Sequence, residues 1–341
     1  MTIESLRLDQ PSVDGTVEAE PLLANLPQVL LIDTLVRQAY FTVPAGPNEG
    51  TEAFRIYYEL HGRGPRRVVF IGGFGMGLVG WENQIRYFAA QPGYQVLVLD
   101  SRGAGWSDTP SGLYTTKTMA HDVLGLLDHV GWTADVHVVG VSLGGMVAQE
   151  MAVEGDLGRF ASLTFVSTTP GRRWFPLSTS CHFVRLMITQ DPREKLRLAQ
   201  GLMFPTFWLD QPCKELEGHP QLVGRVRTNL DFIREGGLDR GRFTRLQTFN
   251  GFLAQLSASL RHWASAEQLQ PLRDHPRVRC LILTGTDDRM IPCADSLLLA
   301  SHLRAPTLVF PGSGHVLPLE QTRRFNAVLD RQFSGADVIG V

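Results

Sequence analysis

One stretch, from position 136 to position 150, constrains the fold of this chain more than any other. It reads VHVVGVSLGGMVAQE, so a short β-branched run leads through Gly-x-Ser-x-Gly into a helix-forming run. This order predicts a strand, a tight turn with Ser142 at its apex, and a helix. Gly140 and Gly144 flank the serine, which indicates that the turn has no room for a Cβ atom on either side.

Such a turn holds a serine clear of the sheet, where it can act as a nucleophile. The helix that begins beside Ser142 directs free N–H groups and the positive end of its dipole towards the reacting atoms. Gly-x-Ser-x-Gly also occurs by chance, and a serine in a loop is usually only a turn former. The strand before the motif and the helix after it favour the nucleophile elbow.

The apolar pattern around this motif predicts a doubly wound, mostly parallel α/β sheet of eight strands. Two alternating segments form an antiparallel hairpin at one edge, and the later strands are continuous apolar runs, typical of a sheet that is buried on both faces. The predicted strands are 37–44, 54–61, 67–71, 95–99, 135–139, 162–166, 278–283 and 307–310. Helices are predicted at 82–91, 116–130, 143–154, 293–303 and 319–333.

The alternation of strands and helices stops between residues 170 and 268. Only helical patterns occur there, at 193–204, 220–235 and 242–263. We therefore expect residues 170–268 to form a helical cap inserted into one domain, whose core consists of residues 36–169 and 269–341. Residues 1–35 are acidic and interrupted by prolines, which predicts an N-terminal arm.

A serine nucleophile needs a base, and the base needs an acid to orient it. The loop after strand 278–283 contains Asp287 and Asp288, and the Gly-rich loop after strand 307–310 contains His315. In a parallel sheet, both loops emerge at the same edge as the serine turn. The chain order Ser142, Asp288, His315 is the order of the α/β-hydrolases.

With these residues in place, the chain resembles the α/β-hydrolase superfamily over residues 36 to 335. The resemblance implies that Asp288 is the acid, with Asp287 as the alternative. In some members the acid follows the sixth strand instead, but residues 167–171 contain no carboxylate. The segment 100–108 resembles the family's Asp-x-Arg-Gly-x-Gly-x-Ser loop, which we expect to be architectural.

The resemblance also implies an oxyanion hole made of two backbone N–H groups. One belongs to Leu143, directly after the nucleophile, and the other to Phe74, after strand 67–71. The family usually has a histidine two positions before that second donor, and here Gly72 replaces it. The loop therefore lacks the family's usual anchor.

The same loop permits another interpretation. Residues 75–80 read Gly-x-Gly-x-x-Gly, and Asp100 ends the next strand, as in a dinucleotide-binding fingerprint. The preceding glycines already make the turn, however, and the helix begins only after the motif. A nicotinamide or flavin oxidoreductase would also leave Ser142, Asp288 and His315 unexplained.

The cap is rich in aromatic and methionine residues, of which most are expected in its core and some above the site. They are Trp174, Phe175, Phe183, Met187, Met203, Phe204, Phe207, Trp208, Phe243, Phe249, Phe252 and Trp263. Residues 171–263 hold 14 Arg and Lys against 8 Asp and Glu, a net charge of about +6, while the whole chain carries −2. This indicates solvated helix faces, or else attraction to anionic substrates or to a lipid surface. Arg172 and Arg173 are the candidates at the pocket rim.

Composition excludes several other classes of protein. The net charge of −2 gives no case for nucleic-acid binding. No apolar run reaches the roughly 18 residues of a membrane span. The N-terminus resembles neither a secretory signal nor a clear transit peptide. The four cysteines show no metal-ligand spacing, and we expect them to be reduced and buried in a cytoplasmic protein.

Together these features predict a serine hydrolase that uses Ser142, His315 and Asp288 and needs no metal or cofactor. The expected substrate is a small apolar carboxylic ester, cleaved through an acyl-enzyme. A thioesterase, a lactonase and a carbon–carbon bond hydrolase share this triad and stay open. So does a ligand receptor that hydrolyses slowly or not at all. The sequence does not determine the oligomeric state.

Overall fold

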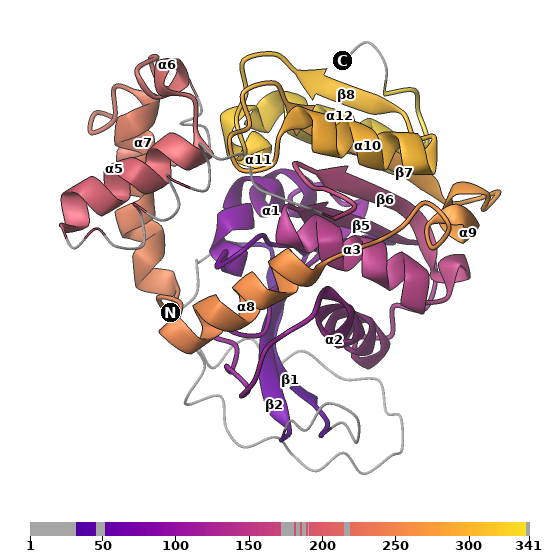
Figure 1. Ribbon diagram of the computed structural model, residues 1–341. Helices are drawn as coiled ribbons and strands as arrows, with labels where there is room; N and C mark the ends of the chain where they lie inside the picture. The colour runs from indigo at the N-terminus through magenta and orange to yellow at the C-terminus, as the bar shows by residue number, and fades with distance from the viewer. Residues whose placement is uncertain are drawn as a thin grey trace.

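The computed structural model describes residues 32–45, 52–171, 181, 185, 189, 191–214 and 219–338 (Figure 1). Residues 1–31 of the predicted N-terminal arm lie outside the described residues. Arg172, Arg173, Trp174, Phe175, Phe183 and Met187 of the predicted cap also lie outside them.

The core is an eight-stranded sheet with the strand order β1-β2-β4-β3-β5-β6-β7-β8. The first two pairings, β1 with β2 and β2 with β4, are antiparallel, and the other five are parallel. The strands are β1 (Leu35–Val43), β2 (Phe54–His61), β3 (Arg66–Ile71), β4 (Tyr94–Leu99), β5 (Val136–Val141), β6 (Phe160–Val166), β7 (Arg279–Gly285) and β8 (Thr307–Phe310). The predicted doubly wound, mostly parallel sheet is confirmed.

Helices cover both faces of the sheet, which explains why its central strands are apolar throughout. Alternate residues of a strand point to opposite faces. Val69 and Leu97 accordingly pack in the cluster with α2 (Thr116–His129), α3 (Leu143–Glu154) and α10 (Cys293–Leu303). Their neighbours Val68 and Val96 pack in a second cluster, with α1 (Glu82–Ala89) and α12 (Thr322–Ser334).

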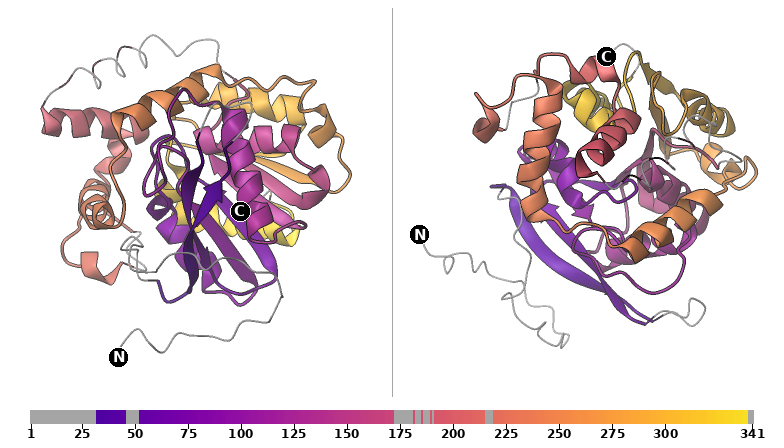
Figure 2. Two further views of the ribbon diagram at one scale, coloured as in Figure 1. Left: turned by 90° about the horizontal axis from the view of Figure 1, so that it is seen from below. Right: turned by 60° about the vertical axis from the view of Figure 1, so that its left-hand side comes forward.

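The segment between β6 and β7 carries the inserted helices. They are α5 (Pro192–Met203), α6 (Thr206–Leu209), α7 (Asn229–Arg240), α8 (Phe249–Arg261) and α9 (Gln270–Arg273). Figures 1 and 2 show α5, α6 and α7 grouped at one side of the molecule, while α8 lies against the core. The limits of the cap, 170 and 268, stay a prediction.

Three predicted helices have different bounds in the structure. The segment 220–235 is a 3-10 turn at Pro220–Leu222 followed by α7. The segment 242–263 is a 3-10 turn at Gly241–Phe243 followed by α8, because the Thr248 side chain caps a new helix by accepting a hydrogen bond from the Gly251 N–H. The closing helix is interrupted at Gln321, whose φ of −129° is not helical, so α11 (Leu317–Glu320) precedes α12.

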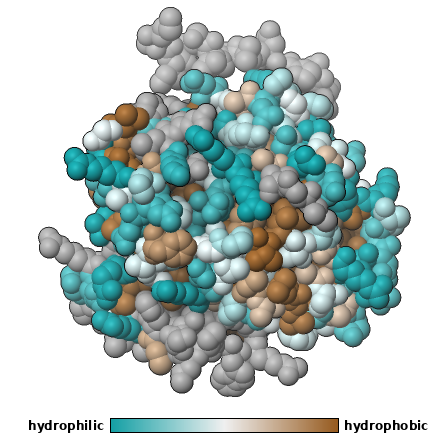
Figure 3. Space-filling model, turned by 90° about the horizontal axis from the view of Figure 1, so that it is seen from above, coloured by the Kyte–Doolittle hydropathy of each residue, from teal (hydrophilic) through white to brown (hydrophobic). Residues whose placement is uncertain are grey.

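The cysteines are free, but the prediction that all are buried was wrong. Cys181 is exposed, and Cys213, Cys280 and Cys293 are half-buried. Large apolar side chains also reach the surface, including Leu246, Phe249 and Trp263 of the insertion. Figure 3 shows one face of the molecule, on which hydrophobic residues gather among hydrophilic ones. In the described part of the chain, no helix combines the length and apolar character that a membrane span requires.

Candidate active site

Ser142 sits in a strained turn between β5 and α3. Its φ of 55° and ψ of −118° lie outside the regions that non-glycine residues favour. The surrounding backbone holds this conformation: the Ser142 N–H donates to the Val166 carbonyl (2.9 Å), and the Thr168 hydroxyl donates to the Ser142 carbonyl (2.7 Å). Strain of this kind persists only where neighbouring contacts enforce it, and it is common at functional sites.

The two glycines beside Ser142 allow three segments of backbone to meet. A Cβ atom on Gly140 would lie 2.3 Å from the Gly144 carbonyl oxygen. A Cβ atom on Gly144 would lie 2.2 Å from the carbonyl oxygen of Ile71, the last residue of β3. Because these neighbours are backbone atoms, they cannot turn aside as a side chain could. The turn that the sequence predicts is therefore present and tightly packed.

His315 and Asp288 meet at the carboxyl edge of the sheet. His315 follows β8, Asp288 follows β7, and His315 Nδ1 lies 2.8 Å from Asp288 Oδ2. The other carboxylate oxygen, Oδ1, accepts hydrogen bonds from the N–H groups of Met290 and Ile291, both at 2.8 Å. Both members of the pair are buried, whereas the alternative acid, Asp287, is exposed. The structure thus pairs His315 with Asp288.

Ser142 and His315 line one cavity of about 380 Å³ between the core and the inserted helices. Most of the other lining residues are apolar: Phe74, Met76, Val79, Val141, Met203, Phe204, Met290, Val316, Pro318 and Leu319. Of the aromatic and methionine residues predicted in the cap, Met203 and Phe204 line the cavity. Trp208 instead packs among the inserted helices against Phe204, with the ring centroids 5.3 Å apart and the rings stacked.

Three further polar side chains line this cavity, and no sequence motif singled them out. They are Glu82 and Asn83 at the start of α1 and Arg240 at the end of α7. Glu82 Oε1 accepts two hydrogen bonds from Arg86 (2.8 and 3.0 Å), and its Oε2 lies 3.7 Å from Arg240. The Asn83 side-chain oxygen lies 2.7 Å from His219 Nε2. The contacts with Arg240 and His219 join the core to the insertion.

The two predicted oxyanion donors belong to segments that border Ser142. Leu143 is the first residue of α3, so its N–H has no acceptor within the helix. Phe74 belongs to a loop that passes against the serine, since a Cβ atom on Gly73 would lie 3.2 Å from the Ser142 Cβ. Phe74 also lines the cavity. That these N–H groups bind an oxyanion stays a prediction.

Glu320 holds the loop that carries His315. Its buried carboxylate accepts hydrogen bonds from the N–H groups of Gly314 (2.7 Å) and Val316 (3.0 Å), the two neighbours of His315. The His315 N–H itself donates to the carbonyl of Met203 (3.0 Å), at the end of α5. Burial raises the pKa of Glu320 to about 7. The sequence analysis did not select Glu320, and the only signal for it was an acidic residue five positions after His315.

Asp100 is engaged inside the protein. Its side chain is buried, and it accepts hydrogen bonds from the N–H groups of Leu78 (2.6 Å) and Trp106 (2.7 Å). The glycine motif at 75–80 leads into a 3-10 turn (Leu78–Trp81), and α1 begins only at Glu82. Asp100 therefore joins two loops, as expected for an architectural residue, and the dinucleotide interpretation finds no support.

Comparison with known proteins identifies the family of this chain. The family model described as alpha/beta hydrolase fold matches residues 66–322, so the chain belongs to this family. The 3-oxoadipate enol-lactonase 2 of Acinetobacter baylyi is 24% identical over 80% of this chain and 91% of its own length. The 2-hydroxy-6-oxononadienedioate/2-hydroxy-6-oxononatrienedioate hydrolase of Paraburkholderia phymatum is 27% identical over 82% of this chain and 91% of its own length.

Among solved structures, a thermophilic esterase from Thermogutta terrifontis superimposes with a TM-score of 0.64. It is 21% identical and covers 88% of this chain and 99% of its own, and this likeness shows the fold alone. The family match and the hydrolases among the relatives make this protein a hydrolase.

The packing of the serine turn predicts that Gly144→Ala is strongly destabilising. The added Cβ would contact the Ile71 carbonyl at 2.2 Å, so we expect the free energy of unfolding to fall by about 3 kcal/mol, measured by urea denaturation. Gly93→Ala is the matched control, because no atom lies within 4 Å of the added Cβ. Equal stability of the two variants would contradict the close packing.

The raised pKa of Glu320 predicts a pH-dependent stability. Between its ordinary value of 4.5 and about 7, the folded state keeps a proton that the unfolded state has lost, so stability falls as pH rises through this range. Glu320→Gln removes that titration. We expect the unfolding free energy of the wild type to drop by about 1–3 kcal/mol relative to the variant between pH 4.5 and 7.5. A difference that does not change with pH would refute the assignment.

Proposed function

We propose that the protein cleaves a carboxylic ester through an acyl-enzyme formed on Ser142. One observation carries the proposal: a histidine that is paired with a buried carboxylate lines the same apolar cavity as a serine in a strained strand–helix turn. This set of groups provides a nucleophile, a base and an orienting acid.

In the proposed mechanism, Nε2 of His315 takes the proton of the Ser142 hydroxyl as the oxygen attacks the ester carbonyl. The N–H groups of Leu143 and Phe74 hold the oxyanion, and each such donor stabilises the transition state by roughly 3 kcal/mol. His315 then protonates the departing alcohol. A water molecule, deprotonated by His315, then attacks the acyl carbonyl, and His315 returns the proton to the Ser142 oxygen as the acid is released. Asp288 stabilises the imidazolium in both steps.

The cavity favours a small and mainly apolar substrate. A volume of about 380 Å³ is at the lower end of the range for small-molecule sites, and most of the lining is aliphatic or aromatic. Glu82, Asn83 and Arg240 provide a polar part that would suit a polar substituent of the ester. The name of one relative specifies an enol-lactonase, which acts on a cyclic ester.

Other activities of the same site stay as alternatives. A lactonase, a thioesterase or a carbon–carbon bond hydrolase would use the same three side chains. An alternative from another class of protein is a receptor that binds its ligand in the same cavity without rapid turnover. A cytoplasmic location and a contact between the basic cap and a lipid surface also stay predictions.

The decisive test is labelling with a fluorophosphonate probe, together with assays of p-nitrophenyl acetate and p-nitrophenyl octanoate. We expect Ser142→Ala to abolish labelling and to lower ester hydrolysis by at least about 1000-fold. The exposed Ser334 provides the control variant Ser334→Ala, which should label and turn over like the wild type. The ratio of the two ester rates measures how long an acyl group the cavity accepts.

Two other results would change the conclusion. If the folded wild type does not label, the serine is not activated, and saturable ligand binding without turnover would then favour the receptor. If the wild type labels at Ser142 but hydrolyses neither ester, the thioester, lactone and carbon–carbon alternatives take precedence.

A further inference from the structure

The loop from Gly72 to Met76, which carries the proposed oxyanion donor Phe74, is held from outside the core. We call it the oxyanion loop. Gly72 has no side chain that could hold the loop, so the loop depends on hydrogen bonds from other groups. The Met76 N–H donates to the Gly73 carbonyl (3.1 Å), which closes a turn within the loop. The Gly75 N–H donates to Gln255 Oε1 (2.9 Å), and Gln255 belongs to α8 of the helical insertion.

The side-chain amide of Gln255 is fully buried and has one defined orientation. Its oxygen accepts the Gly75 N–H and a second hydrogen bond from Gln247 Nε2 (3.0 Å), while its Nε2 donates to the Arg102 carbonyl (2.8 Å). A flipped amide would place NH₂ against two donors and the oxygen against a carbonyl. The network therefore fixes the acceptor towards the oxyanion loop.

A ring contact adds a second link between α8 and the loop. The rings of Phe74 and Phe252 lie 5.1 Å apart at 89°, an edge-to-face arrangement. Phe252 precedes Gln255 by three residues, so both side chains leave α8 on the same side. Gln255 thus holds the peptide group after Phe74, and Phe252 contacts the Phe74 ring itself.

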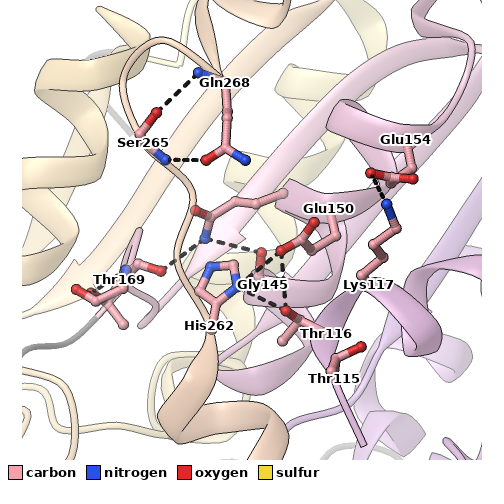
Figure 4. Close-up of polar contacts among 12 residues, drawn as sticks. Thr115, Thr116, Lys117, Gly145, Glu150, Glu154, Thr169, His262, Ser265 and Gln268 are labelled. Carbon is pink, nitrogen blue, oxygen red and sulfur yellow. Dashed lines mark hydrogen bonds and ion pairs between the residues drawn. The ribbon is translucent and has the colours of Figure 1, made fainter.

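The helix α8 is in turn fastened to the core at both of its ends. Near its start, a Cβ atom on Gly251 would lie 2.4 Å from the Gly103 carbonyl oxygen, so the helix backbone touches the 100–108 loop. At its end, the buried His262 Nδ1 lies 3.0 Å from the Thr116 hydroxyl of α2 and 3.5 Å from Glu150 of α3, as Figure 4 shows. Because α8 is held at both ends, Gln255 is a fixed point of attachment for the oxyanion loop.

We infer that Gln255 is a positioning residue for the oxyanion hole, an inference that rests on the proposed hydrolase function. It does not line the cavity and acts through the Gly75 N–H, which fixes the backbone at Phe74. Oxyanion donors stabilise the transition state more than the bound substrate. Loss of this contact should therefore lower kcat and leave KM nearly unchanged.

The test replaces Gln255 by methionine, which has a similar shape but makes none of the three side-chain hydrogen bonds of Gln255. We expect Gln255→Met to lower kcat for the p-nitrophenyl ester that the wild type prefers by about 10–100-fold, with less than about threefold change in KM. Its affinity for a trifluoromethyl ketone, which forms a tetrahedral adduct, should fall by the same factor as kcat/KM. Gln332→Met is the matched control. Gln332 is also a buried glutamine in a helix, and its side chain donates to the backbone carbonyl of Arg279 in β7. It does not line the cavity.

A second variant separates positioning from folding. In Gln255→Glu a protonated carboxyl reproduces both the acceptor and the donor, and burial favours the protonated form. We expect its kcat, as a ratio to the wild type at each pH, to be nearly normal at low pH and to fall as the carboxyl ionises. A structural role alone would lower stability without this pH profile.

The outcomes distinguish this inference from the proposed function. If the wild type neither labels nor hydrolyses, the proposed function fails, and this inference fails with it. If the wild type hydrolyses the ester but folded Gln255→Met keeps the wild-type kcat, with or without a higher KM, the positioning role is wrong. The proposed function would still stand. An equal loss in Gln332→Met, or a pH-independent ratio for Gln255→Glu, would also overturn it.

Discussion

The contact between the carbonyl of Ile71 and the Cα of Gly144 is the constraint on which the site depends. It brings the end of β3 against the first turn of α3, with Ser142 held at a φ of 55° beside it. The oxyanion loop begins directly after Ile71, so the same contact sets the distance between the serine and that loop. A larger residue at position 144 would push the end of β3, and with it the oxyanion loop, away from Ser142.

Buried carboxylates fasten the loops around this contact. Asp100, Asp288 and Glu320 each accept hydrogen bonds from two backbone N–H groups, and Asp288 also orients His315. A buried carboxylate without partners would be costly, whereas one that accepts several N–H bonds keeps a loop in a single conformation. For Asp100 and Glu320, burial outweighs these bonds and raises the pKa of each carboxyl to about 7.

The helical insertion completes the site in two ways. Met203 and Phe204, with Arg240, close the cavity over Ser142 and His315, and α8 holds the oxyanion loop. The same segment thus contributes both to the shape of the cavity and to the geometry of the proposed catalytic groups. One fold can serve different reactions, and the names of two relatives specify an enol-lactonase and a 2-hydroxy-6-oxononadienedioate/2-hydroxy-6-oxononatrienedioate hydrolase.

The sequence alone determined the sheet and the residues at its carboxyl edge. Apolar runs separated by helical periods specify a parallel sheet, and the ends of parallel strands must meet at one edge. Ser142, His315 and the adjacent pair Asp287 and Asp288 could therefore be assigned to one edge from the sequence. Local signals also located most helices, although the starts of α7 and α8 depend on turns and a side-chain cap that the apolar period does not reveal.

Only the tertiary structure decided which of two adjacent aspartates faces His315, and which polar side chains border the cavity. It also revealed Gln255, which contacts Gly75 from 180 residues along the chain. That contact depends on how α8 packs across the core. The sequence of α8 shows a glutamine among glycine and alanine residues on one helix face, but it does not show which group the glutamine contacts. Periodicity is a property of neighbours in the chain, whereas the partner of a buried amide is set by the packing of segments that the sequence keeps far apart.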